Sequence, residues 1–126
     1  MNHNEPKKIM IIDDEKGFTQ FVKSILEETG LYQVLEVNAG YKAVDIARDF
    51  KPDLILLDII MPTGDGAYIA DKLSTDWELK RIPVIFITAA FTQEEASKHD
   101  DMTRGRPCLA KPVGLKELID CIRKHI

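Results

Sequence analysis

Short apolar runs alternate with longer amphipathic stretches along the chain. Four runs, 9–12, 32–37, 54–57 and 84–87, are rich in β-branched and other large apolar side chains, and a weaker fifth run covers 108–110. Apolar runs of this length without strict polar alternation are typical of strands buried on both faces of a parallel sheet. The run 32–37 contains Gln33 and Glu36, which indicates a strand nearer an edge. The pattern therefore predicts five short strands.

The stretches between these runs carry apolar residues at spacings of three and four, as expected of helices that pack on a sheet. Such stripes cover 18–26, 43–50, 67–77 and 115–126, and the third of them includes Trp77. Gly30 and Pro52 follow the first two stripes and predict where those helices end. The stretch 92–101 is more polar, but Thr92 and Glu95 have the spacing of a capping box. It completes a set of five predicted helices.

Five strand–helix repeats predict the α/β class, with a doubly wound, five-stranded parallel sheet and right-handed crossovers, (βα)5. The length of 126 residues fits one domain, 1–126, with 1–6 as an N-terminal tail. Folds of this class place their chemistry at the carboxyl ends of the strands. The residues that follow each run are therefore the candidates for function.

Composition and charge narrow the classes of function. The 17 Lys and Arg against 21 Asp and Glu give a net charge of −4, which argues against a general nucleic-acid binder because such a protein needs a basic surface. Cys108 and Cys121 lack the spacing of a zinc site or a disulfide scaffold. No apolar run is long enough to span a membrane, and the first residues contain no secretory signal. We expect a reduced, cytoplasmic domain without a membrane contact.

Polar side chains follow four of the five runs. Asp13 and Asp14 follow the first run, Asp58 the third, Thr88 the fourth and Lys111 the fifth. Crowded carboxylates need a cation or a proton at neutral pH, and an oxygen-rich site of this size suits Mg²⁺. A carboxylate can also act as a nucleophile toward phosphorus, while a metal ion, an ammonium and a hydroxyl stabilise a phosphoryl group in transfer. Together these residues predict phosphoryl-transfer chemistry.

Each of these residues alone also has an ordinary structural explanation. An Asp after a strand often forms a turn or caps a helix. Thr88 could likewise cap the helix that follows it, and Lys111 could be a solvated loop lysine. A turn and a helix start suffice to explain Asp65 and Gly66. The site is favoured because so many polar groups follow strands that end at one predicted edge of the sheet.

The motifs resemble the receiver domain of two-component response regulators, over about residues 7–126. The segments that carry the resemblance are Asp13-Asp14, Asp58-Ile59-Ile60-Met61-Pro62, Asp65-Gly66, Thr88-Ala89 and Lys111-Pro112. The separations of 30 residues from Asp58 to Thr88 and of 23 from Thr88 to Lys111 are also similar to those of the family. The resemblance implies a flavodoxin-like fold with strand order 2-1-3-4-5.

The resemblance implies a phospho-accepting switch. Asp58 matches the phosphoacceptor, which takes a phosphoryl group from a sensor histidine kinase or a histidine phosphotransfer protein. Thr88 matches the hydroxyl that moves to hydrogen-bond the phosphoryl group, and Lys111 matches the ammonium that pairs with a phosphoryl oxygen. The modified domain is expected to switch a downstream protein target, as a monomer or as a phosphorylation-dependent dimer, with no direct contact to nucleic acid.

Mg²⁺ is the cofactor that the resemblance implies. Asp14 matches a direct metal ligand and Asp13 one that acts largely through bound water. Asp58 and the backbone carbonyl of Ile60 complete the protein's share of the ligands. Such a domain catalyses only its own phosphoryl transfer and dephosphorylation, so it is not an enzyme with an external substrate.

Two departures from the family pattern concern the output. Cys108 stands three residues before Lys111, where the family usually carries a Tyr, Phe or His that rotates inward on activation. A small thiol cannot fill the space that such a ring would enter. Arg104 and Arg106 put positive charge beside the usual partner face, although a solvated loop also explains either arginine.

A third departure concerns dephosphorylation. Ile60 and Ala90 lie two residues beyond Asp58 and Thr88, at positions that border the path of an attacking water. Both side chains are apolar and offer no group to orient that water. They predict slow loss of the phosphoryl group unless a partner supplies the missing group.

Two other functions remain open. A phosphatase of the haloacid dehalogenase type also uses an Asp nucleophile with Mg²⁺, but it requires Asp-x-Asp after its first strand, whereas Asp13 and Asp14 are adjacent. A pseudo-receiver would act as a phosphorylation-independent protein-binding module. Such domains usually lose one of the acidic, Thr or Lys positions, and all of them are present here.

Overall fold

The computed structural model describes residues 5–62, 65–89 and 106–126. Its strands are β1 (Lys7–Ile12), β2 (Tyr32–Val37), β3 (Leu54–Asp58), β4 (Val84–Thr88) and β5 (Cys108–Ala110). Its helices are α1 (Lys16–Glu28), the 3₁₀ turn η1 (Gly40–Lys42), α2 (Ala43–Phe50), α3 (Gly66–Thr75) and α6 (Leu115–His125). The helix expected over 92–101 lies outside the described residues.

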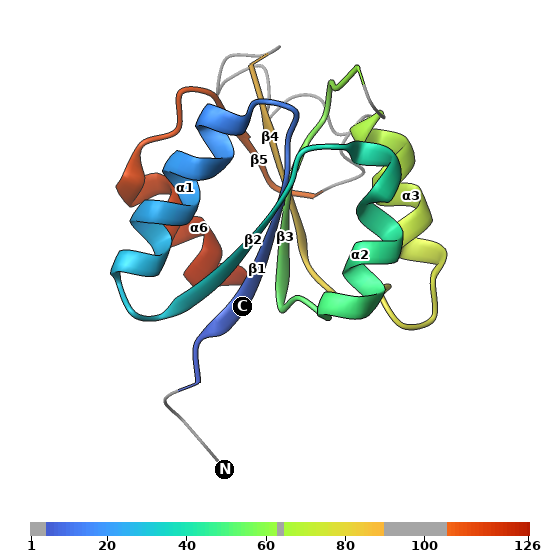
Figure 1. Cartoon of the computed structure of the whole chain (residues 1–126), viewed down its shortest axis with the longest axis horizontal. Coiled ribbons are helices and arrows are strands. Elements are labelled where there is room, and N and C mark those ends of the chain that lie inside the picture. Colours follow the sequence, from blue (N-terminus) through green and yellow to red (C-terminus); the bar gives the residue numbers. More distant parts are fainter. Residues whose placement is uncertain (1–4, 63–64, 90–105) are drawn as a thin grey trace.

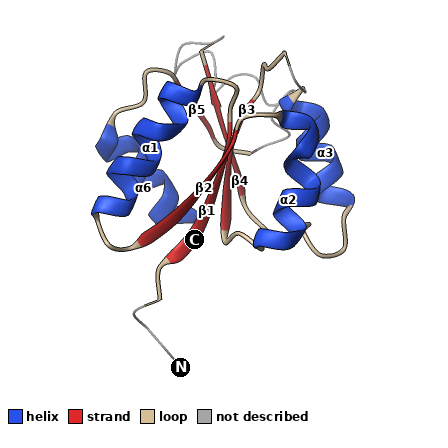
Figure 2. Cartoon of the chain, in the orientation of Figure 1, coloured by secondary structure: helices blue, strands red, loops and turns tan. Residues whose placement is uncertain are grey.

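All strand pairs are parallel, and the sheet has the order β2-β1-β3-β4-β5. The predicted α/β class and strand order are therefore confirmed. Helices α1 and α6 cover one face of the sheet, and α2 and α3 cover the other (Figures 1 and 2). No helix within the described ranges combines the length and the apolar character that a membrane span requires.

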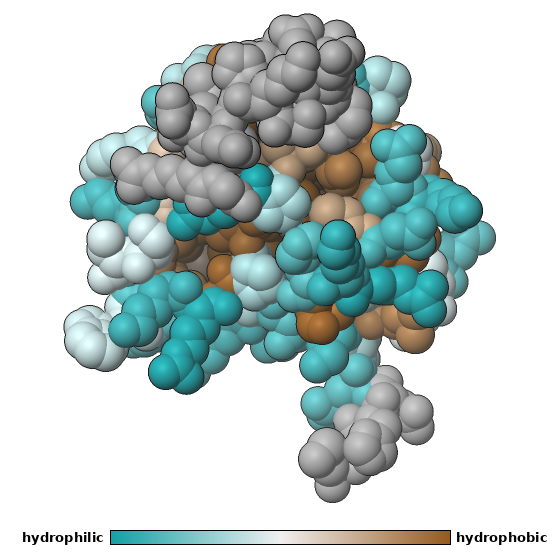
Figure 3. Space-filling model, turned by 180° about the vertical axis from the view of Figure 1, so that it is seen from behind, coloured by the Kyte–Doolittle hydropathy of each residue, from teal (hydrophilic) through white to brown (hydrophobic). Residues whose placement is uncertain are grey.

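The core consists of two apolar layers, one on each face of the sheet. Successive side chains of a strand point to opposite faces, so Met10 and Ile12 pack toward α2 and α3. Ile9 and Ile11 pack toward α1 and α6. Because both faces are covered, β1, β3 and β4 have few positions for polar side chains, which explains their continuous apolar sequences. Seen from behind, hydrophobic residues still reach the surface between hydrophilic ones (Figure 3).

The register of the sheet aligns the carboxyl ends of its central strands. Ile12 pairs with Leu57 across β1 and β3, Asp58 with Ile87 across β3 and β4, and Thr88 with Ala110 across β4 and β5. The residues that directly follow the paired apolar positions therefore meet at one edge of the sheet. This alignment is what positions the candidate site.

The edge strand β2 is closed on its outer side by α1. The backbone N–H of Val34 donates to Glu27 Oε2 at 2.9 Å, and Lys23 Nζ donates to the Val34 carbonyl at 2.7 Å. Lys23 and Glu27 also pair with each other at 2.9 Å, one helical turn apart. Two side chains thus occupy the N–H and the carbonyl of Val34, which lie on the side of the edge strand that no other strand pairs with. The expectation that β2 lies near an edge is confirmed.

The prediction that Trp77 belongs to the buried stripe of the third helix is wrong. Helix α3 ends at Thr75, and Asp76 is already extended, with φ −86° and ψ 127°. The Asp76 carboxylate accepts hydrogen bonds from Arg48 of α2, at 2.6 and 2.9 Å. This contact helps to hold the chain in a turn, and Trp77 is left 85% exposed. The start of α3 agrees with the sequence, since Asp65 Oδ1 caps it by accepting the Ala67 N–H at 2.9 Å.

Candidate functional site

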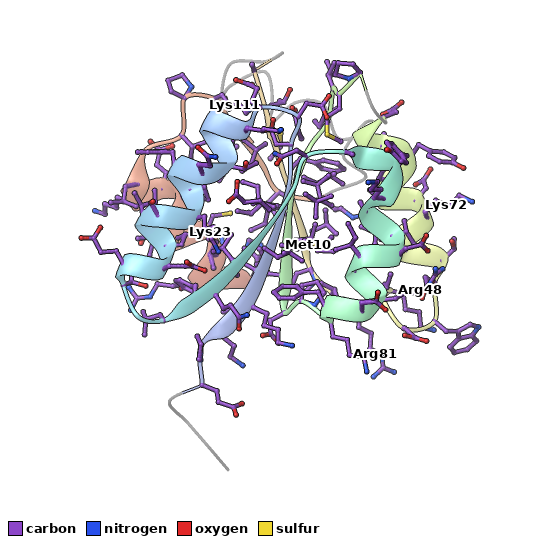
Figure 4. The ribbon with its side chains drawn as sticks, viewed as in Figure 1. Met10, Lys23, Arg48, Lys72, Arg81 and Lys111 are labelled. Carbon is purple, nitrogen blue, oxygen red and sulfur yellow. The ribbon has the colours of Figure 1, made fainter. Side chains whose placement is uncertain are left out.

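A cleft of about 310 Å³ opens at the carboxyl ends of β3, β4 and β5. Its lining residues are Glu15, Asp58, Ile60, Thr88, Ala89 and Lys111. Lys111 lies at this end of the sheet, above the ends of the central strands (Figure 4). The structure therefore brings together Asp58, Thr88 and Lys111, as the strand-end argument predicts.

Asp58 is the last residue of β3, and its side chain is largely buried at the floor of the cleft. Its Oδ1 accepts the backbone N–H of Ile60 in a long hydrogen bond of 3.4 Å. Burial and then the charge of Asp13 raise the pKa of the Asp58 carboxyl, Lys111 opposes both, and the net result is a pKa of about 6. A carboxylate in these surroundings is stabilised by any additional cation in the cleft.

Asp13 directly follows β1 and is buried below the cleft. Its backbone N–H donates to Val37 at 3.0 Å, which continues the pairing of β1 with β2. Its Oδ1 accepts the Glu15 N–H at 2.9 Å, and its backbone carbonyl accepts Asn38 Nδ2 at 2.8 Å. The other oxygen, Oδ2, is buried without a hydrogen bond of good geometry. Its partner is instead the Lys111 ammonium, 2.6 Å away, so this oxygen already faces a cation.

The Lys111 ammonium lies among three carboxylates. Its Nζ is 2.6 Å from Asp13 Oδ2, 2.8 Å from Glu15 Oε1 and 3.8 Å from Asp58 Oδ2. The ring of Phe18 lies against it, with its centroid at 4.4 Å. Burial by itself lowers the pKa of Lys111, but the bonds to Asp13 and Glu15 and the nearby charges raise it above its ordinary value. The ammonium stays charged and acts as the counter-ion of the acidic cluster.

Sequence reasoning missed two residues of this cluster. In the sequence, Glu15 precedes the first helical stripe and Phe18 begins it, yet both contact the Lys111 ammonium. For Glu15 a signal exists, because it extends the acidic pair by one residue and places a third carboxylate beside the same strand end. Phe18 gives no such signal, since an aromatic residue on an apolar helix stripe is ordinary core.

The residues fit a divalent cation, although they are not assembled around one. Within the described part of the chain, no group of three or more His, Cys, Asp or Glu side chains forms a ready metal site. Asp13 and Asp58 nevertheless provide two buried carboxylates, whose oxygens lie 2.6 and 3.8 Å from the Lys111 ammonium that neutralises them. Asp14 lies beside them in sequence and is partly buried. The donor chemistry suits a hard cation that prefers oxygen ligands.

Thr88 and Cys108 occupy the neighbouring strands β4 and β5. Thr88 is buried at the end of β4, and its carbonyl accepts the backbone N–H of Lys111 at 2.8 Å. Cys108 pairs in register with Phe86 and packs against the core layer on the α2–α3 face. Burial raises the pKa of the Cys108 thiol to about 11, so the thiol is neutral at physiological pH. Among the other departures noted in the sequence, Ala90 and Arg104 lie outside the described residues.

The fold and this strand-end cluster define a class of protein, and comparison with known families identifies it. The family of the response regulator receiver domain matches residues 9–123, and the chain belongs to it. The expected resemblance is therefore confirmed, and with it a place in two-component signalling.

Individual relatives support the same assignment. The polar-differentiation response regulator DivK of Brucella anthropi is 31% identical over 124 residues, which cover 96% of this chain and 97% of DivK. The signal receiver domain of a DNA-binding response regulator from Colwellia psychrerythraea superposes with a TM-score of 0.80 at 27% identity, over 94% of this chain and 96% of that one. The chemotaxis protein CheY4 of Vibrio cholerae has the same fold, with a TM-score of 0.82 at 22% identity over 97% and 100% of the two chains.

Proposed function

We propose that this receiver domain accepts a phosphoryl group on Asp58 and thereby switches a protein partner. The donor is a phosphohistidine of a sensor histidine kinase or a histidine phosphotransfer protein. An Asp58 carboxylate oxygen attacks the phosphorus, a P–O bond forms, and the P–N bond to the donor histidine breaks with its electron pair staying on the ring nitrogen. The domain turns over no external substrate, and its place of action is the cytoplasm.

One observation carries this proposal: Asp58, Thr88 and Lys111, from three different strand ends, line the same small cleft. Asp58 supplies the nucleophile at the floor. Lys111 supplies a charged group 3.8 Å from Asp58 Oδ2, close enough to neutralise an oxygen of a group attached there. Thr88 is the hydroxyl residue at the end of the adjacent strand.

Mg²⁺ is the proposed cofactor. Asp13, Asp14, Asp58 and the carbonyl of Ile60 would hold it, with water and phosphoryl oxygens completing the shell. When bound, the ion neutralises the charge that gathers on the phosphoryl oxygens. In the chain itself, Lys111 holds part of this positive charge, because it already bridges Asp13 and Asp58.

The switch follows from contacts that exist only in the modified domain. A phosphoryl group adds about two negative charges and strong hydrogen-bond acceptors, which attract Thr88 and Lys111 toward Asp58. Lys111 then moves from Asp13 and Glu15, and Ala89 moves with Thr88. Because Cys108 replaces the usual ring, we expect the segment that follows β4 in the sequence to carry the change to the partner, whether the domain acts as a monomer or as a phosphorylation-dependent dimer.

The test is intact mass after incubation with a small-molecule phosphodonor, with and without Mg²⁺. We expect a Mg²⁺-dependent gain of one phosphoryl group in the natural chain and none in Asp58→Asn. Glu28→Gln, which changes an exposed carboxylate at the far end of α1, serves as a charge control and should be modified normally.

No gain of mass by the folded chain would overturn the proposal. That result would favour a pseudo-receiver, which binds its partner without phosphorylation. A gain that persists in Asp58→Asn would instead place the acceptor on another residue.

A further inference from the structure

A second hollow lies on the α2–α3 face, and it does not include any residue of the cleft around Asp58. It has a volume of about 390 Å³ and is lined by Gly40, Tyr41, Val44, Asp45, Arg48, Tyr68, Ile69 and Lys72. We refer to these residues as the α2–α3 groove. Arg48 of α2 and Lys72 of α3 lie on this side of the sheet, away from α1 and α6 (Figure 4).

The walls of the α2–α3 groove carry two large exposed aromatic side chains. Tyr41 is 72% exposed and Tyr68 is 60% exposed, and they come from the two different helical segments that form the groove. Tyrosine offers a rigid apolar surface with a polar tip, and it is enriched where proteins bind one another. Neither ring is needed in the core, since neither belongs to the buried layer on this face.

A lysine lies over each of these rings. Lys42 Nζ is 5.6 Å from the centroid of Tyr41, and Lys72 Nζ is 5.4 Å from that of Tyr68. Among the described residues, no carboxylate forms an ion pair with either lysine. Both ammonium groups are therefore available at the rim of the groove.

The remaining charges of the groove are already paired. Arg48 Nη1 lies 2.9 Å from Asp45 Oδ1, and Arg48 Nη2 lies 2.6 Å from Asp76 Oδ2. These bonds tie α2 to the end of α3 and fix the floor of the groove. Arg48, Asp45 and Asp76 together carry a charge of −1, so Lys72 of the groove and Lys42 at its rim leave this surface with a charge of +1, in a chain whose net charge is −4.

We propose that the α2–α3 groove binds an acidic segment of a partner protein, with a bulky apolar side chain between the two tyrosine rings and carboxylates on Lys42 and Lys72. The rings supply the apolar contact, and the lysines select negative charge. The pairing of Arg48 with Asp45 and Asp76 means that the floor is organised before the partner arrives, which lowers the entropic cost of binding.

A second copy of this chain fits the groove less well than an acidic segment. A two-fold contact would place the same surface on both sides, so it would bring Lys42 and Lys72 against the lysines of the other copy. Two chains of net charge −4 also repel each other at long range. A short acidic segment avoids the first difficulty, because it brings carboxylates and no lysine against Lys42 and Lys72.

The experiment uses the full chain and a displayed library of random peptides of about a dozen residues, a length suited to groove recognition. Peptides are selected on the natural chain and depleted on Lys72→Glu. We expect the survivors to be rich in Asp and Glu around one aromatic or large aliphatic residue. Affinity is then measured for a survivor, and its binding site is mapped by amide chemical shifts.

Matched variants separate the groove from general charge effects. Lys72→Glu and Tyr68→Ala should each weaken binding of the selected peptide by about tenfold or more. Lys116→Glu makes the same charge change at an exposed position of α6, on the other face of the sheet, and should leave the affinity within about twofold. Shifts should concentrate on 40–48 and 68–72.

Three outcomes would overturn the proposal. The first is that no peptide distinguishes the natural chain from Lys72→Glu. The second is that the selected peptides are neutral or basic, or that their shifts map elsewhere. The third is that sedimentation shows the natural chain to self-associate and Tyr68→Ala to abolish this, which would assign the groove to contacts between copies. Phosphorylation is not required in any of these experiments, so they are independent of the proposed function.

Discussion

Asp58 lies where burial and the charge of Asp13 both oppose its ionisation, and its carboxyl has a pKa of about 6 instead of 3.8. The folded state therefore holds its proton more tightly than the unfolded state does. Between these two pH values the unfolded chain releases the proton first, so ionisation of Asp58 lowers the free energy of unfolding as the pH rises from about 4 to about 6. Asp58→Asn removes this dependence.

We compare the free energy of unfolding of Asp58→Asn with that of the natural chain, without Mg²⁺. The difference in favour of the variant should increase by about 1–2 kcal/mol between pH 4 and pH 7. This range is below the full linkage value because water screens an open cleft. Urea unfolding of both chains across that pH range measures it, with Asp49→Asn, at an exposed position of α2, as the control. A difference that stays constant with pH would show that the Asp58 pKa is close to its ordinary value.

Ile60 is 60% exposed at the mouth of the same cleft. Its side chain offers no hydrogen bond to a water that approaches the phosphoryl group. If Asp58 is the acceptor, Ile60→Asn should shorten the lifetime of the phosphorylated domain several-fold. This is less than the factor of about 10²–10⁴ that a general base supplies, because an amide can orient a water but does not take its proton. Decay of the added mass with time measures this lifetime, and an unchanged rate would contradict the role assigned to Ile60.

At the scale of the element, Lys23 and Glu27 of α1 bind the outer edge of β2 through the backbone of Val34. Hydrogen bonds from Val34 and Lys23 lower the pKa of Glu27 below its ordinary value of 4.5. The charged form is therefore the one that the fold stabilises. This stability is present above about pH 4.5 and is lost as the pH falls through the lower value of the folded state.

Glu27→Gln should lower the free energy of unfolding by about 0.5–1.5 kcal/mol at pH 7, because a charge-assisted bond becomes a neutral one. The loss should shrink below pH 4.5. Chemical unfolding of the variant beside Glu28→Gln, its exposed neighbour, checks both statements. Equal free energies of unfolding of Glu27→Gln and Glu28→Gln would mean that the contact of Glu27 with Val34 does not stabilise the fold.

The start of α3 is fixed by a close approach of backbone to backbone. A Cβ on Gly66 would overlap the carbonyl oxygen of Asp58 and lie 2.6 Å from Ile59 Cα. Gly66→Ala should therefore destabilise the fold by about 2–4 kcal/mol. Gly17, near the start of α1, has open space around it, so Gly17→Ala should be neutral or stabilising by up to about 1 kcal/mol. Thermal unfolding of Gly66→Ala and Gly17→Ala measures the two changes in stability. Equal changes in both variants would contradict this prediction.

At the scale of the whole molecule, the sheet has a protected centre and more accessible edges. β1 and β3 are flanked by strands and covered by helices on both faces, and Ile9 and Leu54 are fully buried. Amides in these two strands should exchange with solvent only through global unfolding, whereas those of β5 should exchange through smaller openings. Native-state hydrogen exchange measures this, and faster exchange in β1 than in β5 would contradict it.

The sequence predicts most of this architecture because strands buried on both faces leave continuous apolar runs. It also predicts that Asp58, Thr88 and Lys111 meet, since each follows such a run in a parallel sheet. It does not predict that Lys111 binds Glu15, because the two are 96 residues apart and only the folded sheet places them together. The end of α3 was missed for the same reason: helical spacing favours Trp77, and the Arg48–Asp76 contact that holds the turn comes from another helix.

Trp77 has a practical consequence. It is the only tryptophan of the chain, and it is almost fully in water in the native fold. Unfolding moves its indole from water to water, so intrinsic fluorescence is a poor reporter of global stability, and far-ultraviolet circular dichroism has to follow the unfolding experiments. Trp77 directly follows Asp76 in the sequence, and the Asp76 carboxylate is paired with Arg48 of the α2–α3 groove. Because the chain has no other tryptophan, tryptophan emission reports on binding at the α2–α3 face, and no buried tryptophan contributes to the signal.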